Sequence, residues 1–133
     1  MKEKIIELCD TAFLEKIRSR ADYSTLVSKI NAAAEFFVAY NENVLGYAAM
    51  YANDISTKTA YITLIGVRTE YQNNHVGKSL LMECLNIAKI RGMKKLRLEV
   101  LSDNLNAIRF YKKNGFVKED SATSNSVYMV RNV

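Results

Sequence analysis

The segment from Val67 to Ser79 holds the residues whose types and spacing are best suited to chemistry. It joins a run of apolar residues to an amphipathic helix through a polar loop. At a helix start several backbone N–H groups lack intrahelical acceptors and the helix dipole is positive, so a phosphate is a natural occupant. Gly77 lets the backbone approach such a ligand, and Lys78 adds a cation at the same place. An ordinary strand-to-helix turn with a solvated lysine is the alternative that these residues leave open.

Two common phosphate-binding motifs are excluded at this segment. Gly77-Lys78-Ser79 matches the end of a P-loop, but Gln72 stands where that motif requires its first glycine. The dinucleotide-binding fingerprint needs three glycines in G-x-G-x-x-G, and Gly77 is the only glycine between residues 67 and 79.

The elements that must position this segment follow from hydrophobic periodicity and turn residues. The predicted elements are helices within residues 1–34, strands at 36–38, 44–51 and 59–67, a helix at 76–88, a strand at 95–101, a helix at 105–113 and closing strands at 116–118 and 127–130. Asn41-Glu42-Asn43 is expected to turn the first two strands into an antiparallel hairpin. The strand at 59–67 is almost wholly apolar, which predicts that both of its faces are covered.

Capping residues mark where the helices begin and end. Asp10 and Asp22 are candidate N-caps in the first part of the chain, and Ser102-Asp103-Asn104 supplies N-cap chemistry for the last helix. Gly92 and Gly115 are expected just past the ends of two helices. The strand–helix–strand unit over residues 59–101 predicts two parallel strands with a right-handed crossover, and therefore a mixed α/β sheet.

Composition excludes several other classes of protein. The 133 residues, with 49% hydrophobic and 25% charged residues, predict a single globular domain spanning residues 1–133. The chain has neither an apolar run near the ~20 residues of a membrane helix nor a signal peptide, so we expect a cytoplasmic protein without a membrane partner. With two cysteines and one histidine, the chain lacks the residues of a typical zinc site, and we expect no metal.

Charge is unevenly distributed along the chain. Residues 1–66 carry seven Lys/Arg against eight Asp/Glu, a net charge of −1, whereas residues 67–133 carry twelve against six, a net charge of +6. A basic half indicates an anionic ligand or a solvated face. We expect no nucleic-acid partner, because the basic residues neither form a block nor alternate with aromatic residues.

Residues Gln72-Asn73-Asn74-His75-Val76-Gly77 resemble the Q/R-x-x-G-x-G/A motif of the GCN5-related N-acetyltransferase (GNAT) family, whose members use acetyl-CoA. The resemblance continues through Leu98-Glu99-Val100 and Asn104 to Phe110-Tyr111-Lys112-Lys113-Asn114-Gly115-Phe116, the second signature of the family. Residues 59–117 match in order and spacing and would form the acetyl-CoA-binding core. Residues 1–34 correspond to the variable, substrate-facing helices.

The resemblance implies an α/β (α+β) fold with a mixed, mostly antiparallel sheet, a central splayed pair of parallel strands, and flanking helices. One position departs from the family motif, because His75 replaces its first glycine. Only a backbone N–H is needed there, so a Cβ atom is tolerable if the φ angle stays negative.

The resemblance also implies the roles of individual residues. The backbone of Ile65 and Val67, beside a bulge at Gly66, would pair with the pantetheine arm like an added strand, and the amides from Asn73 to Ser79 would hold the pyrophosphate. Tyr111 would protonate the departing thiolate, although a core tyrosine is the alternative reading of that position. The implied cofactor-binding residues are Ile65, Gly66, Val67, Gln72, Asn73, Asn74, His75, Val76, Gly77, Lys78, Ser79, Asn104, Ala107 and Tyr111.

The candidate general base is Glu99, because ribosomal-protein acetyltransferases of this family carry a glutamate here. A strand carboxylate paired with Arg97 or Lys95 is the alternative. Asp54, on a hairpin loop, is a weaker candidate, and His75 is expected beside a phosphate rather than beside the amine.

The sequence therefore predicts an N-acetyltransferase that forms a ternary complex of acetyl-CoA and a primary amine of a small molecule or peptide. A non-catalytic acyl-CoA-binding regulatory domain is the alternative. We expect a homodimer, because the short N-terminal part leaves little wall around the acceptor.

Overall fold

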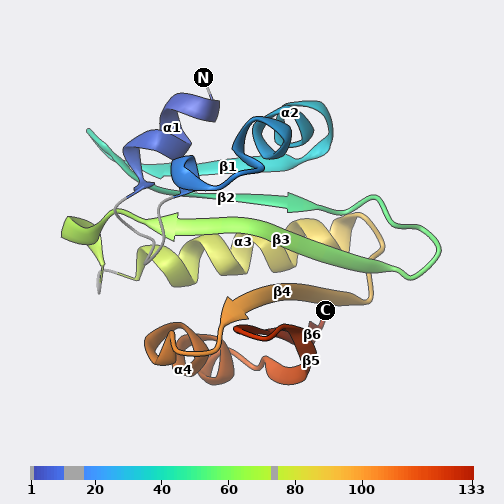
Figure 1. Cartoon of the computed structure of the whole chain (residues 1–133). Coiled ribbons are helices and arrows are strands. Elements are labelled where there is room, and N and C mark those ends of the chain that lie inside the picture. The colour runs from blue at the N-terminus through green and yellow to red at the C-terminus, as the bar shows by residue number, and fades with distance from the viewer. Residues whose placement is uncertain (1, 11–16, 73–74) are drawn as a thin grey trace.

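The computed structural model describes residues 2–10, 17–72 and 75–133 (Figure 1). Its helices are α1 (Lys2–Leu8), α2 (Tyr23–Ala33), α3 (Val76–Ile90) and α4 (Leu105–Lys113), with short 3-10 turns at η2 (Ile17–Ser19) and η3 (Thr69–Tyr71). Its strands are β1 (Glu35–Tyr40), β2 (Val44–Tyr51), β3 (Thr59–Val67), β4 (Lys95–Leu101), β5 (Val117–Thr123) and β6 (Ser126–Asn132).

The six strands form one mixed sheet in the order β1-β2-β3-β4-β6-β5. Neighbouring strands are antiparallel, except that β3 and β4 run parallel at the centre. The helix α3 connects these two strands, and the β1–β2 hairpin turns at residues 41–43. The predicted fold class, hairpin and parallel pair are confirmed.

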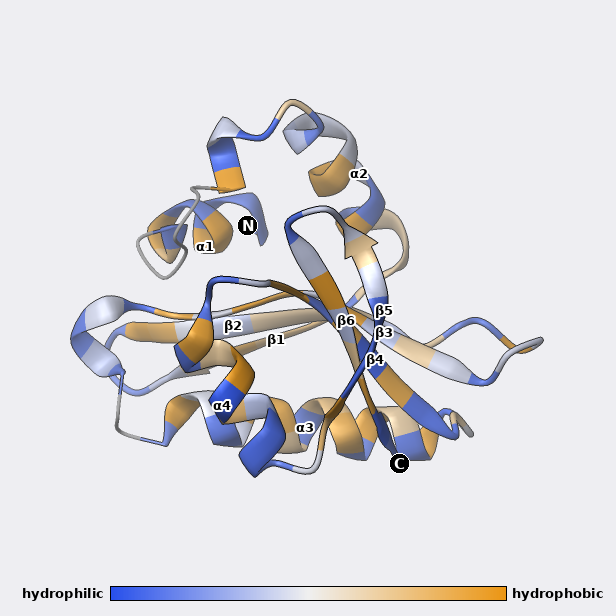
Figure 2. Cartoon of the chain, turned by 60° about the horizontal axis from the view of Figure 1, so that its bottom comes forward, coloured by the Kyte–Doolittle hydropathy of each residue, from blue (hydrophilic) through white to orange (hydrophobic). Residues whose placement is uncertain are grey.

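Helices cover both faces of the sheet, so the molecule has three layers (Figure 2). The apolar side of α3 packs with Ile108 and Tyr111 of α4 against one face, as its periodicity predicts. Ile6 of α1 and Ile30 of α2 pack against the other face, around the fully buried Tyr47. No residue of β3 is exposed, because the strand lies between these two layers.

The strand β3 contains a bulge that reverses which side chains face α3. Ala49 pairs with Leu64, but the next residue, Met50, pairs with Ile62, so Thr63 is an extra residue in β3. The bulge predicted at Gly66 is therefore wrong, since Gly66 stays in register opposite Tyr47. The reason lies in the partner strand: β2 sets the register of β3, and the glycine needs no extra residue to fit there.

The helix caps agree only in part with the predictions. The Asn104 side chain accepts the Ala107 N–H at 3.2 Å and caps α4 as predicted. Gly92 and Gly115 adopt positive φ angles of 78° and 90° just past α3 and α4. Asp22 precedes α2 without a side-chain capping bond, because it pairs with Arg20 instead.

Asp10 also departs from a simple cap. It is 2% exposed, and its carboxylate accepts the Ile17 N–H at 2.6 Å and pairs with Arg18 at 3.1 Å. Residues 11–16, which it was expected to cap, lie outside the described residues. Its role in the described chain is to hold η2 against the end of α1.

The closing strands are longer than predicted. The strand β5 is exposed along almost its whole length and rich in polar residues, so it lacks the apolar alternation that marks a strand in the sequence. Pairing with β6, which itself pairs with β4 along its full length, holds β5 in the sheet.

Candidate active site

The two parallel strands separate toward their carboxyl ends. β3 and β4 pair from Thr59 opposite Lys95 to Ile62 opposite Leu98, and no later pair joins them within the described chain. The bulge residue Thr63 and, on β4, Glu99 are therefore the first residues beyond the last pair. Figure 1 shows β4 bending away from β3 at this end of the sheet.

This separation leaves one edge of β3 open. Between Leu64 and Val67 the strand is paired with β2, so its backbone groups on the β4 side have no strand partner within the described chain. An extended ligand with amide groups can bind such an edge in the way that an added strand does. Ile65, Gly66 and Val67, which the resemblance implies for the cofactor, lie on this open edge.

The loop after β3 is held in place by side chains at both of its ends. The Arg68 guanidinium donates to the Val44 carbonyl at 3.1 Å, and the Arg68 backbone N–H donates to the Leu45 carbonyl at 2.8 Å. Gln72 Nε2 donates to the Val67 carbonyl at 3.1 Å. The side chain of Gln72, the first motif residue, thus shapes the loop. Asn73 and Asn74, two other predicted site residues, lie outside the described residues.

The first turn of α3 presents free amides at the end of this loop. The first backbone hydrogen bond of the α3 helix is the one that the Ser79 N–H donates to the His75 carbonyl, at 3.0 Å. By helix geometry, the N–H groups of Val76, Gly77 and Lys78 therefore have no acceptor within the helix. With the positive end of the helix dipole and the exposed Lys78 ammonium, they form a site suited to a phosphate group.

His75 enters α3 in the left-handed conformation, with φ 62°. The condition for an unstrained Cβ atom at this position, a negative φ angle, is therefore not met. Glycine adopts this conformation without a steric cost, whereas the histidine Cβ is strained against its own backbone.

A glycine at position 77 is explained by packing. A Cβ atom added to Gly77 would lie 3.6 Å from the Phe110 ring and 3.8 Å from the Val67 side chain. These are ordinary contact distances, so the missing side chain faces α4 and β3. The small residue lets α4 approach the beginning of α3.

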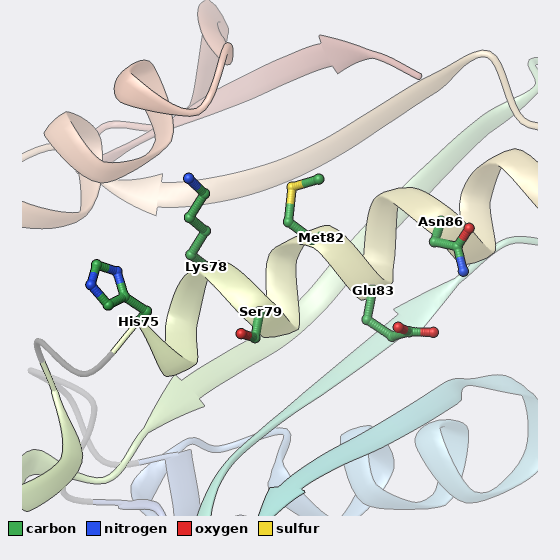
Figure 3. A pocket seen from close by; sticks show the side chains of 6 residues that line it. All are labelled: His75, Lys78, Ser79, Met82, Glu83 and Asn86. Carbon is green, nitrogen blue, oxygen red and sulfur yellow. The ribbon is translucent and has the colours of Figure 1, made fainter.

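A hollow of about 480 Å³ runs along the exposed side of α3. Figure 3 shows its six lining side chains, with Lys78 and Met82 on one side of the helix and Ser79 and Glu83 on the other. The lining residues are His75, Lys78, Ser79, Met82, Glu83 and Asn86. The last three were not among the predicted site residues, although Met82 lies four residues after Lys78, and Glu83 and Asn86 lie four and seven residues after Ser79.

The face of α4 that looks toward the sheet carries Asn104, Ala107 and Tyr111. Asn104 and Ala107 are half-buried. The hydrogen bond that caps α4 uses Oδ1 of Asn104. The two N–H donors on Nδ2 of the same side chain take no part in the cap.

Tyr111 is a core residue of the described fold, with 8% of its surface exposed. Its ring makes edge-to-face contacts with Phe110 and Phe116, at centroid distances of 5.2 and 5.5 Å. Burial raises the pKa of Tyr111 above its usual value, with a smaller contribution from Cys84. The phenol therefore stays protonated at neutral pH, which is the form that can donate a proton.

Glu99 lies on the sheet face opposite α3, because it alternates with the buried Leu98 and Val100. Its Oε2 atom accepts a hydrogen bond from Ser126 Oγ at 2.6 Å. Arg97, the suggested partner of Glu99, pairs instead with Glu119 at 2.9 Å.

Two tyrosines lie near Glu99. Tyr128 is directly opposite it on β6, and the Arg97 guanidinium stacks on the Tyr128 ring at 3.6 Å. Burial raises the pKa of Tyr61 on β3 to about 12, and the Glu99 carboxylate contributes to the shift. A carboxylate beside phenol rings is suited to a cationic amine.

The other candidate base lies elsewhere. Asp54 precedes β3, at the end of the strand opposite to the separation, and its Oδ1 accepts bonds from Ser56 and Thr57 of the same loop. These bonds lower the pKa of Asp54. Asp54 thus organises its own turn, and the structure does not bring it to Glu99.

Cys9 and Cys84 are buried, and neither forms a disulfide. Among the residues that the structure describes, no group of three or more His, Cys, Asp or Glu side chains is arranged to hold a metal ion. No helix in the described ranges is long and apolar enough to span a bilayer.

Comparison with known proteins bears on this arrangement. Over 73 residues the chain is 34% identical to a spermidine N(1)-acetyltransferase of Thermoplasma acidophilum. The aligned segment covers 55% of this chain and 45% of that protein. The match thus spans less than half the length of that relative.

Solved structures share the fold along nearly the whole chain. The PaiA N-acetyltransferase of T. acidophilum in complex with coenzyme A superimposes with a TM-score of 0.78 and 26% identity, covering 98% of this chain and 92% of that chain. A GNAT family acetyltransferase of Elizabethkingia anophelis with acetyl-CoA bound superimposes with a TM-score of 0.77 and 19% identity, covering 100% of this chain and 91% of that chain. At that identity the second match shows the fold alone.

A family model describes most of the sequence as well. The model of the acetyltransferase (GNAT) family matches residues 3–116, which include the open edge of β3, the first turn of α3 and all of α4. The separated strands, the helix start and this match agree: the chain belongs to the GNAT family of acetyltransferases.

Proposed function

We propose that the chain is an acetyl-CoA-dependent N-acetyltransferase that moves the acetyl group to a primary amine by direct attack in a ternary complex. Membership of the GNAT family and the coenzyme A complex of the T. acidophilum structure support this. The observation that carries the proposal is that the open edge of β3 and the free amides of α3 lie at the same end of the sheet. One extended ligand with an amide-bearing arm and a pyrophosphate can therefore bind both.

The cofactor is proposed to lie between the separated strands. Its pantetheine arm pairs with the backbone of Ile65 and Val67, with Asn104 and Ala107 on its other side. The pyrophosphate takes the free amides at the start of α3 and the Lys78 ammonium. The hollow along α3 then receives the nucleotide portion, which continues from the pyrophosphate.

The acceptor amine is proposed to approach from the sheet face that carries Glu99. The carboxylate removes a proton from the attacking ammonium, and the neutral amine forms a bond to the acetyl carbonyl carbon. A backbone N–H of the open β3 edge stabilises the resulting oxyanion. The carbon–sulfur bond then breaks, and the thiolate takes the proton of the Tyr111 hydroxyl. The nitrogen loses its second proton, which restores the Tyr111 phenol through solvent, and Glu99 returns its proton to water. The products are the amide and free coenzyme A.

The type of acceptor follows from the side chains around Glu99. Tyr61 supplies aromatic surface beside the carboxylate, while Arg97, which stacks on the Tyr128 ring, is neutralised by Glu119. We propose a cationic primary amine, of a small molecule or a peptide, as the acceptor class. The similarity to a spermidine N(1)-acetyltransferase supports a cationic acceptor.

Acetyl-CoA binding tests the cofactor site directly. Lys78→Glu reverses the charge at the start of α3, and Lys89→Glu makes the same change in its last turn, far from the proposed pyrophosphate. Both lysines are exposed, so both variants should fold. Calorimetry should show affinity reduced by about 10- to 150-fold in Lys78→Glu, since a charge-assisted contact contributes roughly 1.5–3 kcal/mol. An equal loss in both variants, or no loss in Lys78→Glu, contradicts this site.

Turnover separates the enzyme from the alternative, a non-catalytic acyl-CoA-binding domain. Release of free thiol from acetyl-CoA, measured with a panel of polyamines, amino sugars and peptides, should identify an acceptor. Glu99→Gln should lower kcat/KM by ~10²–10⁴-fold, because the attacking amine loses its general base. Tight acetyl-CoA binding without acetylation of any amine in the panel favours the non-catalytic domain.

A further inference from the structure

Ser126 is a buried polar residue that the proposed mechanism does not use. It is the first residue of β6, and 1% of its surface is exposed. A side-chain hydroxyl buried to this extent needs hydrogen-bond partners. It has two: Glu99 Oε2 at 2.6 Å and Thr123 Oγ1 at 2.8 Å. Thr123 lies on β5, opposite Ser126 across the β5–β6 turn.

The direction of these bonds follows from counting protons. An ionised carboxylate only accepts, so the single hydroxyl proton of Ser126 is donated to Glu99. The Thr123 hydroxyl must then donate to Ser126 Oγ, and its own oxygen accepts the Asn125 backbone N–H at 3.1 Å. The result is a chain of three donors, from the Asn125 amide through both hydroxyls to one oxygen of Glu99.

This chain determines where the carboxylate points. The bond from Ser126 to Glu99 joins β6 to β4, and a bond of 2.6 Å to an ionised acceptor is short and strong. Because Oε2 is occupied, Oε1 is the oxygen left for a ligand. Each hydroxyl polarises the next, so removing Thr123 weakens the bond from Ser126 as well.

We propose that Ser126, supported by Thr123, is a positioning residue that orients the Glu99 carboxylate toward the acceptor amine. This inference rests on the proposed function, in which Glu99 is the general base. Ser126 does not contact the amine itself, because it is buried behind the carboxylate. Its effect on the rate must therefore pass through Glu99.

A double-mutant cycle tests this dependence. Ser126→Ala should lower kcat/KM for the amine by about tenfold, within the range of coupled neighbouring residues, and leave the KM for acetyl-CoA unchanged. In the Glu99→Gln background the same substitution should cost nothing further, because the base is already lost. A structural role would lower the rate by the same factor in both backgrounds.

Thr123→Val serves as the second variant and guards against misfolding of Ser126→Ala. Valine has the shape of threonine without the hydroxyl, and position 123 is exposed, so the fold is kept. We expect a smaller loss of kcat/KM, of about two- to threefold, again absent in the Glu99→Gln background. If Thr123→Val and Ser126→Ala both act at the wild-type rate, or lose rate equally in both backgrounds, the positioning role is overturned.

The outcome for Glu99→Gln alone distinguishes this inference from the proposed function. Wild-type kcat/KM in Glu99→Gln removes the base assignment and the positioning role together. A slow Glu99→Gln enzyme with neutral Ser126→Ala and Thr123→Val variants overturns only the positioning role.

Discussion

At the scale of single residues, the two proposed proton-transfer groups lie in opposite environments. Tyr111 is packed between two phenylalanine rings on the α3 side of the sheet, whereas Glu99 is exposed on the opposite side. A thioester held between β3 and β4 would have the acid on one side and the base on the other. This arrangement lets proton removal from the amine and proton delivery to the thiolate occur without the two groups meeting.

Tyr111→Phe removes the proposed acid while keeping the ring. The edge-to-face contacts with Phe110 and Phe116 are retained, so acetyl-CoA affinity should stay within a few-fold of the wild type. The rate constant kcat should fall by ~10²–10⁴-fold, because the thiolate loses its proton donor. Thiol release and calorimetry measure the two quantities. The loss should shrink with a thioester whose thiol is more acidic, and full turnover in the variant contradicts the assignment.

His75→Gly should stabilise the protein. The left-handed φ of 62° strains a residue with a Cβ by roughly 1–2 kcal/mol, and glycine removes this strain while losing more entropy on folding. The net gain in unfolding free energy should be about 0.5–1 kcal/mol, measured in urea. His75→Ala keeps the strain and is the matched control, so an equal gain in both variants contradicts the backbone explanation.

At the scale of elements, the site depends on how closely β2, β3 and α3 approach one another. The register between β2 and β3 places the bulge at Thr63, and the end of β3 sets where the loop to α3 begins. Gly46 on β2 lies at this contact. A Cβ atom there would be 2.5 Å from the Gly66 carbonyl oxygen and 3.0 Å from Val67 Cα, distances that backbone atoms cannot accommodate without shifting.

Gly46→Ala should therefore push β2 away from the open end of β3. We expect a loss of about 1–3 kcal/mol in unfolding free energy, as for other overpacked sites. Gly77→Ala is the control for stability, since its Cβ would meet only side-chain atoms at 3.6 Å or more and alanine suits a helix better than glycine. Urea unfolding of both variants measures the difference, and equal stability would show that β2 and β3 can move apart freely.

At the scale of the whole molecule, the core contains ionisable groups that are neutral when folded. Burial raises the pKa of Cys84 to about 12, from an ordinary value of 9.0, and also raises that of Tyr111. The same cause raises the pKa of Cys9 to about 11, against an opposing effect of Arg68. A raised folded pKa contributes stability that is complete below the unfolded pKa and is lost as pH rises toward the folded value.

The unfolding free energy should therefore be steady near neutral pH and fall above pH 9.0, the ordinary value for a thiol. Each group contributes a slope of up to about 1.4 kcal/mol per pH unit. Cys84→Ala removes one of these groups and should give a shallower decline, although its stability at neutral pH is lower because of the cavity. Urea unfolding between neutral and alkaline pH measures both slopes, and identical slopes contradict the role of Cys84.

The local elements of this protein are determined by the sequence to a large degree. The predicted bounds of β3, β4 and α4 match the structure, because the apolar run of β3, the alternation in β4, the Asn104 cap and the glycine that follows α4 are all local signals. The loop-to-helix junction after Val67 was likewise predictable from a polar segment between an apolar strand and an amphipathic helix. The roles of Tyr111 and Glu99 came from resemblance to the family and remain predictions.

The geometry of the site was decided by contacts between distant parts of the chain. The bulge lies at Thr63 because β2 sets the register of β3, and His75 takes a positive φ where the chain enters α3. Glu99 binds Ser126, 27 residues away, because β6 returns beside β4. Periodicity and caps depend on neighbours along the chain, whereas register, strand separation and side-chain partners depend on which strands meet.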